Sequence, residues 1–261
     1  MGCRCFFGFL FTGGDVLELQ GLRFAQGGRE LVHNLNIRLP TGETCVVLGS
    51  NGVGKSTLLM TIAGLHAPDE GSILLGGEEL SLMSPKQRAR CLAWCGDLPA
   101  DNFGLTVHDR LELAAGDCDE QRLLEAAGRF ELLGLLNRDM AGLSAGERQR
   151  CELAAMLLRD VPIWLLDEPC AHLDLRHQKD ALSMIREQKV HGRLVIVVLH
   201  DLLQAACVAD RVLLLDGKGG WQFGEAAQLM QQEVLESLYQ AKLSPCGEMV
   251  SGAKLLIPDF S

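Results

Sequence analysis

The chain has 261 residues, of which 48% are hydrophobic and 22% charged, and its formal net charge at pH 7 is −10. This length and composition predict a folded protein with an ample hydrophobic core and exclude a disordered chain. The negative charge argues against general binding to nucleic-acid backbones, although a local anion site needs only a few donors.

The longest apolar runs, such as Leu194–Leu199, are far shorter than the roughly 20 residues that cross a bilayer, so no membrane-spanning helix is expected. The ten cysteines are scattered and include no Cys-x-x-Cys, which predicts a reduced, cytosolic chain. Residues 1–14 are apolar but lack a cleavage pattern. We expect a disordered leader there, with membrane adhesion through its phenylalanines as the alternative.

Strand signals begin near Val16, where "VLELQGLRF" and "NLNIRL" alternate apolar and polar residues. The next strand, "TCVVLG", is continuously apolar and leads through a glycine-rich turn into a helical stretch, "KSTLLMTIAGL". Residues 85–160 are predicted to be mainly helical, with "DEQRLLEAAGRFELLGLL" read as one of the helices. We interpret this part as a helical insertion.

Further along the chain, "IWLLD", "LVIVVLH" and "RVLLLD" are predicted as buried strands separated by helices. This alternation is typical of a parallel sheet with right-handed crossovers. "DGKGGWQF" predicts a hairpin turn and "AAQLMQQEVLESLYQA" one closing helix, followed by a tail at 241–261.

The segment "GSNGVGKST", Gly49–Thr57, matches the phosphate-binding pattern G-x-x-x-x-G-K-[ST] between a strand and a helix. Its glycines permit a tight loop whose N–H groups surround phosphates, and the helix N-terminus adds a favourable dipole. Lys55 is placed to reach the β- and γ-phosphates, and Ser56 to bind Mg²⁺. The nucleotide-binding residues expected here are Gly49, Ser50, Asn51, Gly52, Gly54, Lys55, Ser56 and Thr57.

The segment "IWLLDEP" ends a buried strand with two carboxylates. Such a pair is common in solvated loops, but with a phosphate-binding loop in the same chain it favours a nucleotide site. Asp167 is then expected to hold Mg²⁺ and Glu168 to polarise the attacking water.

In "LSAGERQRCELA", Ser144 and Glu147 form a capping box, which predicts a helix start. A capped helix N-terminus beside Gly146 also suits a phosphate.

Together these segments resemble the ATP-hydrolysing subunit of an ABC transporter, with "LSAGE" as a variant of the family's LSGGQ signature. "LLDEP", "AHLD" and the His200 that ends "VVLH" follow in the family's order and spacing over residues 16–240. The resemblance implies an α/β fold: a P-loop core with a mainly parallel sheet, a small antiparallel β region and a helical subdomain. The expected ATPase domain spans residues 15–240, with its helical subdomain at about 85–160.

The family further implies that two such subunits close head to tail as a homodimer. The signature of one subunit would then face the nucleotide of the other, Glu168 would act as general base, His200 would sense the γ-phosphate, and Asp174 would link the two sites. The signature residues expected to bind in trans are Ser144, Ala145, Gly146 and Glu147.

"DEPCAHLDLRHQ" resembles the subgroup that serves importers of iron chelates, haem and cobalamin. This implies an ATPase using ATP and Mg²⁺, peripheral on the cytoplasmic side of the plasma membrane, with two polytopic permease subunits and a substrate-binding protein. The alternative is a soluble ABC ATPase acting on ribosomes or in DNA repair. A degenerate, non-hydrolysing module is a third interpretation, against which the intact Lys55, Asp167, Glu168 and His200 argue.

The sequence departs from the family pattern at two positions. Gln26 falls where an aromatic residue usually stacks on adenine, so adenine selectivity is expected to be weak, and Phe24 is expected in the core. In "CLAWCGDLPA", Asp97 replaces the glutamine of the Q-loop, where it can still favour Mg²⁺ or merely cap the loop. Cys91 and Cys95 lack further ligands nearby and are expected to pack around Trp94 rather than bind metal.

Overall fold

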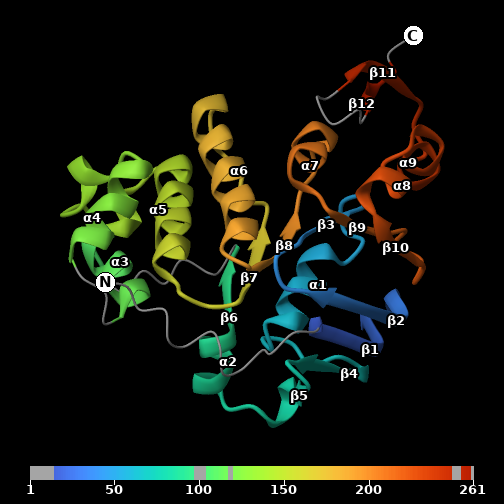
Figure 1. Cartoon of the computed structure of the whole chain (residues 1–261), viewed down its shortest axis with the longest axis horizontal. Helices are drawn as coiled ribbons and strands as arrows, with labels where there is room; N and C mark the ends of the chain where they lie inside the picture. The colour runs from blue at the N-terminus through green and yellow to red at the C-terminus, as the bar shows by residue number, and fades with distance from the viewer. Residues whose placement is uncertain (1–14, 97–103, 117–119, 249–253, 260–261) are drawn as a thin grey trace.

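The computed structural model describes residues 15–96, 104–116, 120–248 and 254–259 of the chain. At its centre lies a six-stranded sheet in the order β10-β9-β3-β8-β7-β6 (Figure 1). All neighbouring strands are parallel except β10, which pairs antiparallel with β9. The bounds are β3 Thr44–Leu48, β6 Leu92–Cys95, β7 Ile163–Asp167, β8 Leu194–Val198, β9 Arg211–Leu215 and β10 Trp221–Glu225. This mainly parallel sheet confirms the expected α/β class.

A second, antiparallel sheet has the order β2-β1-β4-β5 and lies beside α1 (Figure 1). Its strands are β1 Asp15–Gln26, β2 Arg29–Pro40, β4 Glu70–Leu75 and β5 Glu78–Glu79. Leu17 and Leu19 of β1 pair with Leu39 and Ile37 of β2, and all four side chains are buried. The expected small antiparallel β region is therefore present.

Helices α3, α4 and α5 gather at one end of the molecule (Figure 1). Capping boxes begin α2, α3 and α5. The α-helices are α1 Lys55–Ile62, α2 Pro85–Cys91, α3 Val107–Ala115, α4 Glu120–Arg129, α5 Ala145–Leu158, α6 Leu175–Val190, α7 Leu202–Val208, α8 Ala226–Leu229 and α9 Gln232–Tyr239. Short 3₁₀ turns occur at η2 Leu80–Leu82, η3 Leu133–Leu135 and η4 Met140–Gly142.

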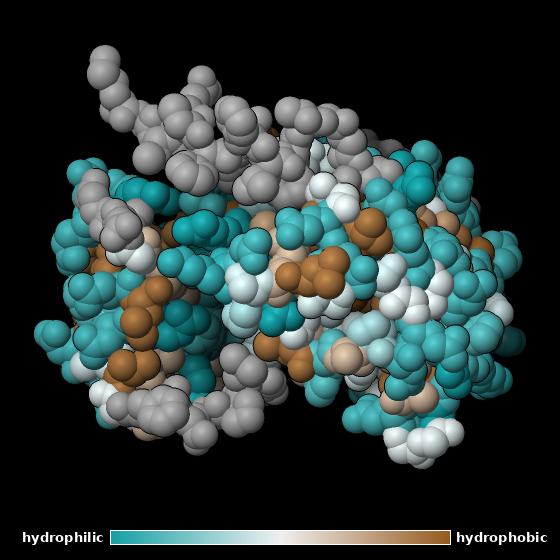
Figure 2. All heavy atoms as spheres, turned by 90° about the horizontal axis from the view of Figure 1, so that it is seen from below, coloured by the Kyte–Doolittle hydropathy of each residue, from teal (hydrophilic) through white to brown (hydrophobic). Residues whose placement is uncertain are grey.

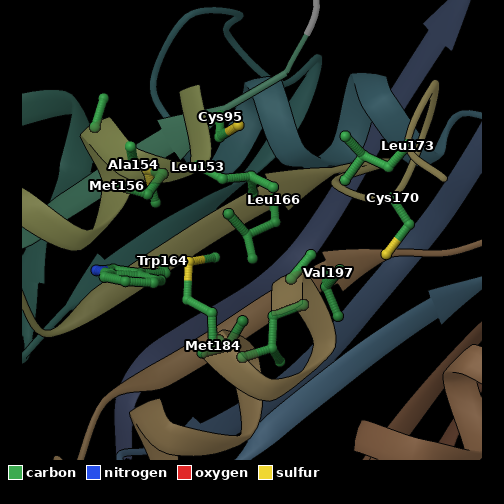
Figure 3. Packing of buried hydrophobic residues seen from close by; sticks show 14 of the residues in the cluster. Cys95, Leu153, Ala154, Met156, Trp164, Leu166, Cys170, Leu173, Met184 and Val197 are labelled. Atoms are coloured by element: carbon green, nitrogen blue, oxygen red, sulfur yellow. The ribbon is translucent and has the colours of Figure 1, made fainter. Parts of the chain in front are cut away.

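The main sheet separates two hydrophobic cores because strand side chains alternate between its faces. Val46 and Leu48 of β3 belong to one core, and Cys45 and Val47 belong to the other. In the first core, Figure 3 shows Trp164 of β7 next to Met184 of α6, with Ala154 and Met156 of α5 nearby. This packing holds β7 between α5 and α6.

The two predicted continuous helices are shorter than expected. The first ends at Arg129, because Glu131 takes a left-handed φ of 54° and the Leu132 N–H donates to Ala127 O at 2.8 Å. The predicted closing helix is split into α8 and α9, since Gln231 is extended and its side chain donates to Ala227 O at 2.6 Å. Neither break has a glycine or proline at the turning residue.

Two further regions add detail to the expected organisation. Within residues 85–160, β6 joins the main sheet beside β7. After α9, the segment expected to be a tail contains an antiparallel hairpin of β11 Leu243–Glu248 and β12 Lys254–Pro258. Leu243 and Leu256 of this hairpin are buried in the first core.

Cys91 and Cys95 are both buried, as expected for packing residues, but they do not share one environment. Cys91 packs in the same core as Trp94, whereas Cys95 belongs to the core on the other face of the sheet. The expectation that both surround Trp94 is therefore wrong for Cys95. Among described residues, the possible metal-ligand group is His108, Asp109 and Glu112, which includes neither cysteine.

None of the helices in the described ranges is both long and apolar enough to cross a bilayer. Figure 2 shows that hydrophobic side chains on the viewed face form small patches separated by hydrophilic ones. Residues 1–14 lie outside the described part, so the expected disordered leader stays a prediction.

Candidate functional site

The phosphate-binding loop connects the buried strand β3 to α1. Gly49 is pressed against β9, and a Cβ at this position would lie 2.5 Å from Leu215 O. Gly54 has a φ of 103° and lies over Phe24 and Leu31, so a side chain there is disfavoured by both conformation and space. Between these glycines, Ser50, Asn51 and Gly52 are exposed. Ser56 and Thr57 lie in the first turn of α1 and are half-buried.

Lys55 is the buried cation of this loop, with 5% of its surface exposed. Its ammonium donates to Gly49 O at 2.8 Å and to Ser50 O at 3.0 Å. Burial lowers the pKa of Lys55, and the nearby charges of Glu168 and Asp167 partly oppose that effect. Lys55 therefore closes the loop within electrostatic range of Asp167 and Glu168.

The carboxylates at the end of β7 meet the phosphate-binding loop in one pocket of about 200 Å³. Glu168 has a left-handed φ of 50°, and its N–H donates to Val198 O at 3.2 Å. This unusual backbone conformation is typical of functional sites held in place by their surroundings. The pocket is lined by Ser56, Met60, Trp94, Gln149, Asp167, Glu168, Ala171 and His172.

His200 follows β8, the strand beside β7, and reaches Glu168 from there. His200 Nε2 and Glu168 Oε1 are 2.6 Å apart. Both side chains are partly exposed, at 41% for His200 and 45% for Glu168, so a ligand can approach them. The structure thus brings together Ser56, Asp167, Glu168 and His200, all of which the sequence singled out.

The "LSAGE" segment starts α5, and its capping box is formed. Ser144 N–H and Oγ each donate to Glu147 Oε2 at 2.8 Å, and Glu147 N–H donates back to Ser144 Oγ at 3.2 Å. The Ser144 N–H and then its hydroxyl lower the pKa of Glu147. Ser144 and Ala145 are exposed, and none of the segment's residues lines the pocket of the same chain.

The same helix contacts the loop that follows Glu168. A Cβ on Gly146 would lie 2.8 Å from His172 O, and Gln149 Nε2 donates to Pro169 O at 3.0 Å. Gln149 also lines the pocket, although the sequence analysis did not single it out. Its spacing of three residues from Gly146, which places both on one helix face, is the signal that could have found it.

Asp174 caps the N-terminus of α6, where its Oδ1 accepts the His177 N–H at 2.9 Å. This bond is the main cause that lowers the pKa of Asp174. Its side chain is 67% exposed and does not line the pocket.

Gln26 lies at the exposed end of β1, whereas Phe24 is buried beneath Gly54 as expected for a core residue. Asp97 lies outside the described residues. Just before it, Gly96 is packed closely: a Cβ there would lie 2.6 Å from the Trp94 ring and 2.9 Å from Asp167 Cβ. Neither Trp94 nor Met60 was expected in the pocket.

Known proteins are similar to this chain in sequence and in fold. The sequence model of the family described as "ABC transporter" matches residues 32–171. The chain is 36% identical to the hemin import ATP-binding protein HmuV of Streptomyces coelicolor, over 95% of this chain and 92% of that protein. It is 31% identical to the petrobactin import ATP-binding protein FpuD of Bacillus anthracis, over 93% of each.

Among solved structures, the chain is similar to an ATP-binding subunit of an ABC transporter. The TM-score is 0.76 at 27% identity, and the match covers 86% of this chain and 98% of that one.

Proposed function

The chain belongs to the ABC transporter family, and from this premise we propose that its hydrolysis of ATP drives the import of an iron chelate, haem or cobalamin. ATP binding and hydrolysis follow from the family. The cargo class is supported by relatives named for hemin and petrobactin import, which align over nearly their whole length. One structural observation carries the ATPase mechanism. Ser56, Asp167 and Glu168 line one pocket, and the His200 ring contacts the Glu168 carboxylate.

In this proposal the phosphate-binding loop holds the phosphates of ATP, with Gly49 and Gly54 allowing the backbone to approach them closely. Lys55 exchanges its bonds to Gly49 O and Ser50 O for the β- and γ-phosphates. Glu168 takes a proton from the attacking water, and His200 contacts the γ-phosphate beside it. The partly exposed positions of Glu168 and His200 support these roles.

The residues present fit Mg²⁺. The Ser56 hydroxyl and the Asp167 carboxylate line the same pocket, and Mg²⁺ prefers oxygen ligands of these kinds. We assign them as its protein ligands, with Asp97 as a further candidate. The ion would neutralise charge on the phosphate oxygens during hydrolysis.

We further propose that two copies of the chain close head to tail. The exposed capping box on α5, with Ser144, Ala145, Gly146 and Glu147, then faces the nucleotide of the other copy. None of these four residues lines the pocket of its own chain, which supports an action in trans. Asp174 is exposed at the start of α6, where it can contact the partner and link the two sites.

The domain arrangement that we propose has residues 15–240 as the ATPase domain, with a helical subdomain at about 85–160. The dimer would lie on the cytoplasmic side of the plasma membrane beneath two polytopic permease subunits, served by a substrate-binding protein. The competing function is a soluble ABC ATPase that acts on ribosomes or in DNA repair.

Co-purification distinguishes these functions. The full chain, tagged at its C-terminus, is isolated with Mg²⁺ and ATP in a mild detergent, and its partners are identified by mass spectrometry. The Lys55→Ala variant, with impaired nucleotide binding, serves as the matched control. We expect a polytopic membrane protein with the wild-type chain, whereas enrichment of ribosomal proteins or DNA in its place would overturn the transport function.

A further inference from the structure

The side chain of Asp174 is held more firmly than an ordinary helix cap. Its Oδ1 accepts the backbone N–H of His177 at 2.9 Å and also lies 2.9 Å from His177 Nδ1. Because an ionised carboxylate only accepts hydrogen bonds, Nδ1 carries the proton in this contact. A cap needs only the backbone bond, so the ring adds a second constraint on a largely exposed carboxylate.

The ring of His177 is itself enclosed between two carboxylates. Only 9% of His177 is exposed, and its Nε2 lies 3.4 Å from Glu131 Oε2 without forming a hydrogen bond. The other oxygen of Glu131 lies 2.6 Å from the Arg176 guanidinium. Glu131 therefore forms an ion pair with Arg176 and lies beside the His177 ring at the first turn of α6.

Glu131 belongs to the turn after α4, and that turn is fixed by the signature helix α5. Arg150 Nη1 of α5 donates to Phe130 O at 2.8 Å and lies 3.2 Å from Glu131 O. Phe130 and Leu132 on either side are fully buried. Since Ser144 caps the same helix, a series of neighbouring polar groups leads from the signature helix past Glu131 and His177 to Asp174.

We propose that His177 is a positioning residue, which fixes the direction of the Asp174 carboxylate relative to the signature helix of the same chain. The inference rests on the proposed function, in which Asp174 links the two ATP sites. A shift of α5 would then be passed to Asp174 through Glu131 and the imidazole. The chemistry of the ring matters for this role, because an apolar ring of similar size fills the space but donates no hydrogen bond.

Three variants of the full chain test the role of the ring. His177→Phe keeps most of the packing volume and removes both ring nitrogens, whereas His177→Asn keeps a donor at the position of Nδ1. We expect His177→Phe to lower kcat roughly 10-fold, as for the loss of a hydrogen bond to a charged group, with KM for ATP nearly unchanged. His177→Asn should retain most of kcat. His191→Ala, at the exposed other end of α6, is the matched control.

The same measurement in the Asp174→Ala background separates positioning from packing. If His177 acts through Asp174, adding His177→Phe to Asp174→Ala causes no further loss of kcat. Equal losses in both backgrounds, or a His177→Asn variant as slow as His177→Phe, would overturn the inference. If Asp174→Ala leaves kcat unchanged, the proposed role of Asp174 in linking the two sites is wrong. If Asp174→Ala lowers kcat but His177→Phe does not, only the positioning role of His177 is wrong.

A variant at Glu131, on the other side of the ring, provides a separate test in case the His177 variants do not fold. Glu131→Gly removes the carboxylate, and glycine suits the left-handed φ of 54° at this position. Thermal unfolding should show a folded protein, while kcat falls with KM nearly unchanged. A folded Glu131→Gly variant with wild-type kcat would contradict the connection from α5 to Asp174.

Discussion

Glu168 Oε1 and His200 Nε2 lie 2.6 Å apart, although their residues are 32 positions apart in the chain. The contact follows from sheet topology, because β7 and β8 are neighbouring parallel strands whose carboxyl ends share one edge. Glu168 follows the first strand directly and His200 closely follows the second. The sheet therefore aligns the proposed base with the proposed γ-phosphate sensor.

Gly146→Ala should reduce both stability and ATPase activity. In a helix interior this change ordinarily stabilises by up to about 1 kcal/mol, but here the new Cβ would lie 2.8 Å from His172 O. We expect the variant to unfold at lower urea concentration and to hydrolyse ATP several-fold more slowly. Gly128→Ala in α4, where the new Cβ would lie 3.8 Å from Leu133 Cδ1, is the control and should hydrolyse ATP at nearly the wild-type rate. A more stable Gly146→Ala protein with full activity would refute the contact.

Gln26→Tyr should increase the preference for ATP over GTP. An aromatic ring at the exposed end of β1 can stack on a base, which contributes about 1–3 kcal/mol in single-stranded binders. Competition of GTP against ATP in the ATPase assay measures the preference. Ala25→Tyr places the same ring at the exposed neighbouring residue, whose side chain points to the other face of the strand. Equal selectivity in both variants and the wild type would show that position 26 does not approach the base.

Asp97→Gln should alter the Mg²⁺ dependence of hydrolysis. A carboxylate binds Mg²⁺ more strongly than an amide oxygen does, so the variant should need a higher Mg²⁺ concentration for half-maximal activity. The measurement is the ATPase rate over a Mg²⁺ titration at saturating ATP, with Asp101→Asn as the control in the same segment. An unchanged titration would leave Asp97 with no part in metal binding.

The parts of the site that sequence reasoning found are those fixed by local chain geometry. The phosphate-binding loop and the Asp167–Glu168 pair stand directly after buried strands, so their positions follow from strand order. Gln149 and His172 line the pocket because α5 packs on the loop after β7. No local sequence pattern encodes this packing.

The helix boundaries that sequence reasoning missed have a similar explanation. Glu131 ends its helix with a positive φ that non-glycine residues rarely adopt, and the cost is offset by contacts from Arg176 and Arg150. Those partners lie on α6 and α5, far away in the sequence. The hairpin of β11 and β12 likewise depends on burial of Leu243 and Leu256 in a core formed mostly by earlier residues.

The buried cysteines should resist alkylation in the folded protein. Burial raises the pKa of Cys45, Cys151 and Cys170 to about 12 in each case, which disfavours the reactive thiolate at neutral pH. Cys207 and Cys246 are exposed and should react with iodoacetamide at pH 8. Peptide mass spectrometry before and after unfolding in guanidinium checks this. Labelling of Cys170 in the folded chain would indicate an accessible thiol and contradict the structure.

The central claim is that Glu168 activates water in a site closed by a second copy of the chain. Glu168→Gln keeps the side chain's size and removes its basicity, so hydrolysis should fall roughly 10²- to 10⁴-fold while ATP binding persists.

The most direct test is light scattering coupled to size-exclusion chromatography of Glu168→Gln with Mg²⁺ and ATP. Glu233→Gln, an exposed position on α9, is the control. We predict a stable dimer, about twice the 28.4 kDa of one chain, that forms with ATP and is absent with ADP. A Glu168→Gln protein that stays monomeric with ATP, or that hydrolyses ATP at the wild-type rate, would contradict the account.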